Sequence, residues 1–306
     1  MPALERSPRS AARRARPGAV AAPTAGSGGY TIVEMIIVMA ITAVIMGAAV
    51  TIYQVMQRTT LRATSNEASL VQARAIVDKF GGDFRMVGAA WNFYSSSITA
   101  ATGTSITFNG DIDNTLDASY NPVRLTAALA AGATSMTVSD LTNIACGTKV
   151  TLANGPIAET HQLASSGCTS GTNTVNFQGS DTPVTSYPAG AVGTGDVTFV
   201  YTIESVNWVW DSGTQKLCRR VNGTCPASAG SWSDDSDVIA DSVTNFCLTY
   251  MDYTGTLLNS SCGAPSASAL SSIRAVIVTV TVSSKVGDQT VSRQMELTAR
   301  ARALTP

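Results

Sequence analysis

A single carboxylate, Glu34, lies beside the longest uncharged stretch of the sequence. Residues 35–57 carry no charge, and Glu34 follows Gly29 by five positions. A helix of about 20 apolar residues crosses a hydrocarbon layer of about 30 Å, so this stretch is long enough to span a membrane. An ionised group at that depth costs roughly 2.5–3.5 kcal/mol and normally has a partner. The sequence therefore predicts that Glu34 meets a cationic group.

A basic segment precedes this stretch. Residues 1–29 contain one acid, Glu5, and five arginines: Arg6, Arg9, Arg13, Arg14 and Arg16. Such a segment is expected to act as a leader that stays on the cytoplasmic side of a membrane. Two alternatives are a secretory signal cut near residues 47–49 and a signal anchor that is never cut. Neither accounts for an acid placed between the basic and apolar regions.

Residues 29–34, Gly-Tyr-Thr-Ile-Val-Glu, and the uncharged helix after them resemble the cleavage and methylation motif of type IV prepilins and type II secretion pseudopilins. The resemblance implies that a prepilin peptidase cuts after Gly29 and methylates the amino group of Tyr30. It also implies that Glu34 neutralises the α-amino group of a neighbouring subunit, which makes both charges tolerable in an apolar filament core. Tyr30 replaces the commoner phenylalanine, and Thr51 stands where the family often has proline.

The same resemblance implies a non-enzymatic subunit that crosses the bacterial inner membrane once and holds its head in the periplasm. The subunit then enters a type IV pilus or type II secretion pseudopilus at the cell surface. Its implied partners are other major and minor pilins, the prepilin peptidase, the inner-membrane assembly platform and, before assembly, lipid. The bulky head favours a minor pilin or minor pseudopilin that initiates assembly or lies at the tip. The alternative is a tip adhesin or a DNA-uptake binding module.

The predicted fold class is α+β, with a long N-terminal helix packed on an antiparallel β-sheet head. We expect the helix over residues 30–82, with residues 33–57 in the membrane. Leu70, Ala73, Val77 and Phe80 recur at helical spacing, and Gly81-Gly82 is expected to end the helix. Residues 83–306 form the head. The segment 83–88 and the strand order after residue 196 resemble PilW- and PulJ-like minor pilins.

Alternating polar and apolar residues predict the strands of the head. The expected strands cover residues 105–108, 135–138, 149–152, 196–204, 273–282 and 289–299. Residues from about 125 to 195 are rich in small side chains. We interpret them as an insertion, either a β subdomain or long loops, stapled by a Cys146–Cys168 disulfide.

Six cysteines lie in the second half of the chain: Cys146, Cys168, Cys218, Cys225, Cys247 and Cys262. An even number of cysteines after an export signal indicates disulfides. Many pairings are possible, and proximity in sequence favours 146–168, 218–225 and 247–262. Zinc binding is the alternative, but there is no CxxC pair and only one histidine.

Other candidates for chemistry are few. His161 lacks a Gly-x-Ser-x-Gly elbow to serve and is expected on the surface. Asp111, Asp113 and Asp117 place oxygen ligands at alternate positions, as calcium loops do, but the glycine and closing glutamate of such loops are missing. We therefore expect a solvated turn and no cofactor, with calcium as the alternative.

Two pairs of large side chains complete the list. Trp208 and Trp210 are two residues apart and are expected to serve the core. Arg219 and Arg220 lie between two cysteines and could contact DNA or a partner pilin. The net charge of −1 argues against a nucleic-acid binder as a general class.

Overall fold

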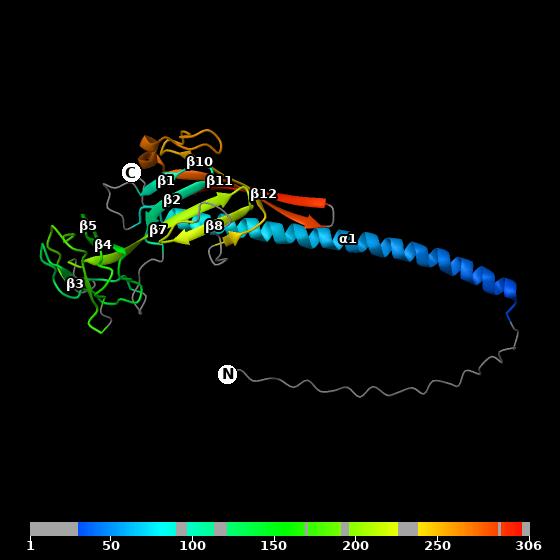
Figure 1. Cartoon of the computed structure of the whole chain (residues 1–306), viewed down its shortest axis with the longest axis horizontal. Helices are drawn as coiled ribbons and strands as arrows, with labels where there is room; N and C mark the ends of the chain where they lie inside the picture. The colour runs from blue at the N-terminus through cyan, green and yellow to red at the C-terminus, as the bar shows by residue number, and fades with distance from the viewer. Residues whose placement is uncertain are drawn as a thin grey trace, which may run out of the picture. The chain divides into compact units, whose positions relative to one another are not determined.

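A computed structural model describes residues 30–89, 97–112, 121–168, 171–190, 196–225, 238–286 and 289–301. Contacts divide the chain into two units, Met1–Gln57 and Arg58–Pro306. One helix, α1 (Ile32–Arg85), begins in the first unit and ends in the second (Figure 1). The strands pair antiparallel throughout the described residues, so the predicted α+β class is confirmed.

The other elements follow in chain order. They are β1 (Ile98–Ala101), β2 (Ser105–Gly110), β3 (Ser135–Thr137), β4 (Lys149–Asn154), β5 (Ile157–Gln162), β6 (Thr174–Asn176), β7 (Phe199–Asp211), β8 (Lys216–Val221), β9 (Val238–Ala240), β10 (Val243–Met251), the 3-10 helix η3 (Ala267–Ser272), β11 (Ala275–Val286) and β12 (Gln289–Arg300). A seven-stranded sheet has the order β1-β2-β7-β4-β5, with β8 also paired to β7 and β9 to β8. Separate sheets have the orders β10-β11-β12 and β3-β6.

The main core of the head lies between the last turns of α1 and the two larger sheets. Phe80 stacks on Phe84 at 5.9 Å between ring centroids and meets Trp208 edge-on at 5.3 Å. Phe246 of β10 and Phe108 of β2 complete this aromatic cluster. The predicted apolar face of the helix is therefore the face that packs on the sheets. Leu70, at the start of this face, is half-buried.

The insertion has a core of its own. Buried residues from Val123 to Val200 form a second apolar cluster that includes Leu152 and Tyr187. Strand β7 connects the two cores, since residues 199–203 pair with β4 and residues 204–211 with β2 and β8. The insertion is thus a β subdomain built on one end of a strand whose other end belongs to the main core.

We expected the helix to end at Gly81-Gly82, but it continues to Arg85. Gly81 is buried, and a Cβ there would lie 2.7 Å from Cδ2 of Leu297 on β12. This glycine therefore lets β12 approach the helix. Helical bonding stops before Gly88, whose φ of 75° is the left-handed conformation that favours glycine at a helix end.

A buried carboxylate joins the end of α1 to the seven-stranded sheet. Asp83 is 3% exposed. Its Oδ2 accepts hydrogen bonds from Arg219 Nε on β8 at 2.6 Å and from Trp208 Nε1 on β7 at 3.1 Å. Arg219 Nη2 donates to Oδ1 at 3.1 Å. A carboxylate at this depth is tolerated because a bidentate guanidinium and an indole N–H satisfy it.

Replacing Asp83 with Asn should therefore destabilise the head by about 3 kcal/mol, because the partly buried guanidinium of Arg219 would lose its counter-charge. Urea unfolding measures the change. Lys79→Met is the matched control, since Lys79 is half-exposed and lies 3.8 Å from Asp83; it should cost no more than about 1 kcal/mol. Equal effects of the two substitutions would contradict this assignment.

Candidate functional site

Glu34 takes part in a reciprocal pair of hydrogen bonds at the start of α1. Its Oε2 accepts from the Thr31 backbone N–H at 2.9 Å and from Thr31 Oγ1 at 3.0 Å. The Glu34 backbone N–H in turn donates to Thr31 Oγ1 at 3.2 Å. This is a capping box, which satisfies backbone donors that the first turn of a helix leaves unpaired. Glu34 itself is exposed.

No role was predicted for Thr31 from the sequence. The signal was present, because Thr-x-x-Glu immediately before an apolar run is the sequence signature of a capping box. The structure therefore gives Glu34 a local function besides the predicted pairing with a second subunit. Tyr30 is 82% exposed, and Gly29 lies outside the described residues.

Among the described residues, none covers the apolar part of α1. Every residue from Ile32 to Gln57 is exposed. The most apolar window of 18 residues has a mean hydropathy of 2.6, and none of it is buried. Thr51 donates to the Gly47 carbonyl at 2.9 Å within the helix. By length and composition this helix can cross a membrane, and its exposed apolar surface needs lipid or other helices around it.

All six cysteines form disulfides. The pairs are Cys146–Cys168, Cys218–Cys225 and Cys247–Cys262, the three that proximity in sequence favoured. No cysteine is left as a thiol, so the zinc alternative through cysteine is wrong. The first disulfide lies in the insertion, as expected, and the other two lie in the rest of the head.

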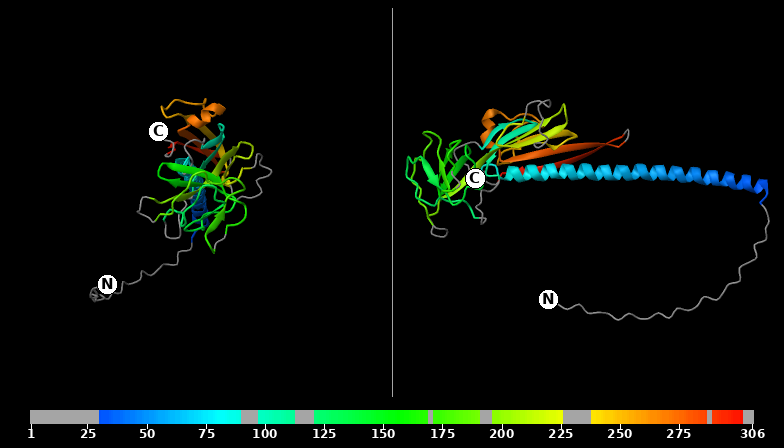
Figure 2. Two further views of the ribbon diagram at one scale, coloured as in Figure 1. Left: turned by 90° about the vertical axis from the view of Figure 1, so that its left-hand side faces the viewer. Right: turned by 60° about the horizontal axis from the view of Figure 1, so that its bottom comes forward.

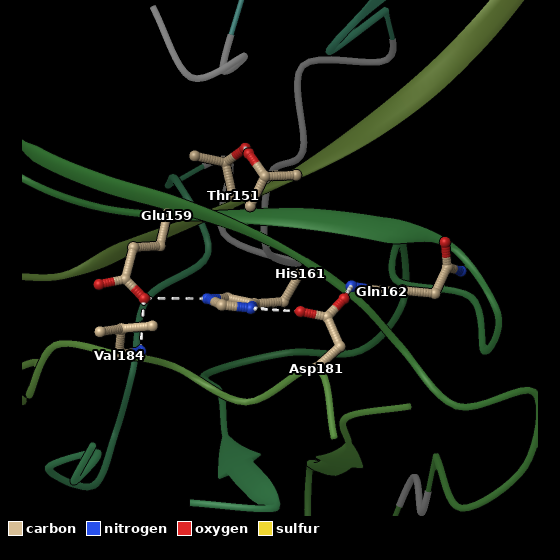
Figure 3. Close-up of polar contacts among 7 residues, drawn as sticks. Thr151, Glu159, His161, Gln162, Asp181 and Val184 are labelled. Atoms are coloured by element: carbon tan, nitrogen blue, oxygen red, sulfur yellow. Dashed lines mark hydrogen bonds and ion pairs between the residues drawn. The ribbon is translucent and has the colours of Figure 1, made fainter. Parts of the chain in front are cut away.

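We expected His161 on the surface, but it is a buried residue of β5. Nδ1 lies 3.0 Å from Asp181 Oδ1, and Nε2 lies 3.2 Å from Glu159 Oε2 (Figure 3). Strand alternation places Glu159 and His161 on the same face, and the segment before β7 supplies Asp181. Both ring nitrogens are occupied, so the imidazole has no open position from which to serve as a catalytic base.

Both carboxylates beside His161 have further donors. Burial alone would raise the pKa of Glu159, but hydrogen bonds from Thr185, the Val184 N–H and His161 outweigh it, and the pKa lies below its usual value. Burial likewise opposes a lowering at Asp181, yet the Gln162 N–H, His161 and the charge of Lys149 lower the pKa of Asp181. The cluster therefore favours ionised carboxylates and clamps β5 to residues 181–184.

The remaining candidates have structural contacts. Trp208 is fully buried and Trp210 half-buried, with its indole N–H donating to the Val243 carbonyl at 2.8 Å, which confirms the predicted core role. Arg219 and Arg220 do not form one patch, because Arg219 binds Asp83 while Arg220 donates to the Thr224 carbonyl. The guanidinium of Arg219 is therefore engaged within the head, and contact of this pair with DNA or a partner pilin stays a prediction.

The calcium candidate is only partly described. Asp111 is buried at 3% exposure, while Asp113 and Asp117 lie outside the described residues. Within the described ranges, no group of three or more His, Cys, Asp or Glu side chains is placed to hold one metal ion. The solvated turn stays a prediction for Asp113 and Asp117, with calcium binding as its alternative.

Comparison with known proteins gives little further information. No protein-family model and no curated protein matches the chain. Among solved structures, a type IV-like pilin from Thermus thermophilus matches 53% of this chain and 87% of that chain, at 9% identity and a TM-score of 0.24. A likeness at this level carries no argument about function, so the functional argument depends on the residues themselves.

The carboxylates around His161 make the stability of the folded head depend on pH. A lowered carboxyl pKa stabilises the folded state above the ordinary value near pH 4, and that stability is lost as the pH falls through the lowered value. Glu159→Gln should therefore cost about 1–2 kcal/mol near neutral pH, and the cost should shrink below about pH 4.

Thermal midpoints measured from neutral to acidic pH test this dependence. Asp78→Asn is the control, because Asp78 is exposed on α1. A difference between wild type and Glu159→Gln that is constant over the whole pH range would overturn the clamp.

Proposed function

We propose that the chain is the precursor of a pilin-like subunit, specifically a minor pilin or minor pseudopilin of a type IV pilus or type II secretion pseudopilus. The observation that carries this proposal is the motif at residues 29–34, followed at once by an exposed and uncharged helix. In this proposal residues 33–57 anchor the precursor in the inner membrane, and the head faces the periplasm.

The proposed mechanism begins with cleavage after Gly29 and methylation of the new amino terminus on Tyr30 by a prepilin peptidase. Glu34 then exchanges part of its capping box for the amino group of a neighbouring subunit. Because its Oε2 already points at the Thr31 backbone N–H, three residues toward the amino end, the carboxylate is oriented toward the terminus of its own helix. A short movement could redirect it to an adjacent terminus.

Leaving lipid brings no hydrophobic gain, so packing and the ion pair must guide assembly. The helix offers Gly47, Ala48 and Ala49 for close approach of a neighbouring helix. Major and minor pilins and the inner-membrane assembly platform are the proposed partners. The head carries two apolar cores, and its bulk favours a low-copy subunit at the tip or at the start of a filament.

The proposed role is non-enzymatic. It uses the head as a folded, disulfide-stapled body and the helix as the part that assembles. Its three disulfides suit the periplasm and the cell surface, where disulfides persist.

Mass spectrometry of the natural product should find a chain that starts at Tyr30 and carries one methyl group on its amino terminus. Gly29→Val should leave the full precursor uncut, because a branched side chain hinders the extended backbone in a protease cleft. Gly26→Val, the same change inside the leader, should be processed normally. A mature chain that starts elsewhere would refute the proposed processing.

Glu34→Gln separates the two functions of this side chain. Glutamine also completes a capping box, so the helix, the membrane anchor and cleavage should persist. Filament incorporation should fall at least about tenfold, because the neighbouring amine would lose its counter-charge. Thr31→Val is the converse change: it removes the capping hydroxyl, keeps the charge, and should reduce incorporation less. Shear fractions and membranes are compared by immunoblot, and normal incorporation of Glu34→Gln would contradict the pairing.

A further inference from the structure

The face of α1 that meets the sheets changes from polar to mostly apolar along the helix. From Ala73 to Phe84 this face is buried in the main core, and Asp83 is its one charged residue. The preceding two turns present polar side chains to the same side. We call this second part the polar seam, and it consists of Ser65, Asn66, Ser69 and Gln72 on α1 together with Asp241 and Ser284 opposite them.

The direct contacts across the polar seam are a few hydrogen bonds: one between two hydroxyls, one to a backbone carbonyl and a long one to an exposed carboxylate. Ser65 Oγ lies 2.6 Å from Ser284 Oγ on β11. Gln72 Nε2 donates to the Asp241 carbonyl at 3.0 Å and lies 3.4 Å from Oδ1 of the same residue. Water replaces such bonds at little net loss, so they hold the helix less firmly than the aromatic cluster does.

Two buried atoms of the polar seam gain from opening. Asn66 Oδ1 and Ser69 Oγ are shielded from solvent and have no hydrogen-bond partner within the described protein. The Ser69 side chain as a whole is buried, since this residue is only 2% exposed. A buried polar atom without a partner is unfavourable, and contact with water would satisfy it. Closure of the seam therefore carries a penalty that the contacts farther along α1 do not.

The contacts farther along α1 are more extensive. Figure 2 shows the β11–β12 hairpin running along α1. In the register of the hairpin, Ser284 lies two residues before the end of β11, and Leu297 of β12 lies against Gly81. Phe80, Phe84 and the Asp83–Arg219 pair attach the last turns of the helix to the sheets. Separation can therefore begin at the hairpin end and stop at Ala73.

We propose that the polar seam is a latch: residues 58–72 of α1 separate from the β11–β12 hairpin and close again, while residues 73–85 remain packed. The latch is a property of the head itself. It deepens the proposed function, on which its use in assembly rests, by giving a filament subunit a helix segment that can leave its own head and meet a neighbour.

Hydrogen exchange with mass spectrometry on the full chain in detergent micelles tests the latch. Separation removes the packing that stabilises this part of the helix, so amides in residues 58–72 should exchange at least about tenfold faster than those in residues 73–85. Ser69→Ala removes an unpartnered hydroxyl at nearly constant shape and should slow exchange in residues 58–72 about threefold or more, with no change in residues 73–85. Ala68→Ser changes helix propensity in the opposite sense on the exposed side, and should speed exchange in residues 58–72 by no more than about twofold.

A cross-link distinguishes opening from ordinary fraying of the helix. The native cysteines are all paired, so Ser65→Cys and Ser284→Cys together should form one new disulfide across the seam. The oxidised double variant should protect residues 58–72 to the level of residues 73–85, and each single variant should behave as wild type. Fast exchange that persists in the cross-linked chain, equal protection of both segments in the wild type, or no effect of Ser69→Ala would overturn the latch.

These measurements use the unassembled chain, so their outcome is independent of whether the protein enters a filament. Assembly of the cross-linked variant is then a separate readout. Loss of incorporation only in the oxidised double variant would support use of the latch in assembly, and normal incorporation would refute that use.

Discussion

The carboxylate of Asp83 lies where the end of α1 meets β7 and β8, and the arrangement of the head depends on how it is satisfied. An acid at 3% exposure must have partners, and Arg219 and Trp208 supply them from adjacent strands. These bonds fix the rotation of the helix about its axis. With that rotation set, Phe80 and Phe84 point into the main core, and the polar seam faces the β11–β12 hairpin.

Strand β7 has a comparable effect on the insertion. Its first residues contribute Val200 to the core of the insertion, and its later residues contribute Val206 and Trp208 to the main core. A bend or break in this strand would separate the two cores. The insertion has interactions of its own, because an apolar cluster, a disulfide and the carboxylates around His161 all lie within it.

Glu34 combines two requirements in one side chain. In the chain described, it closes a capping box with Thr31. In the proposed filament, it would neutralise a neighbouring amine. These requirements are compatible because both partners are N–H donors near a helix start, where the helix dipole also favours a negative charge. The motif can therefore satisfy the helix before assembly and the ion pair after it.

Several positions show where prediction from sequence failed. The expected strand at 196–204 begins later, at Phe199, and continues to Asp211, because β7 also pairs with β2 and β8. Gly81-Gly82 suggested a helix end, but the close approach of Leu297 explains Gly81 and the helix continues. His161 appeared to be a surface residue, since nothing local reveals that Asp181 lies opposite its ring, twenty residues away.

The sequence by itself determined the features that depend on neighbouring residues. These are the uncharged run that makes a helix long and apolar enough to cross a membrane, the Thr31–Glu34 cap, the alternation that forms strands, and the short spacings that favour the observed disulfide pairs. Only the tertiary structure decided which distant groups meet: Asp83 with Arg219, His161 with Asp181, and the polar seam with the hairpin. The physical reason is that periodicity and capping act within a few residues, whereas the partner of a buried polar group is set by how the elements pack.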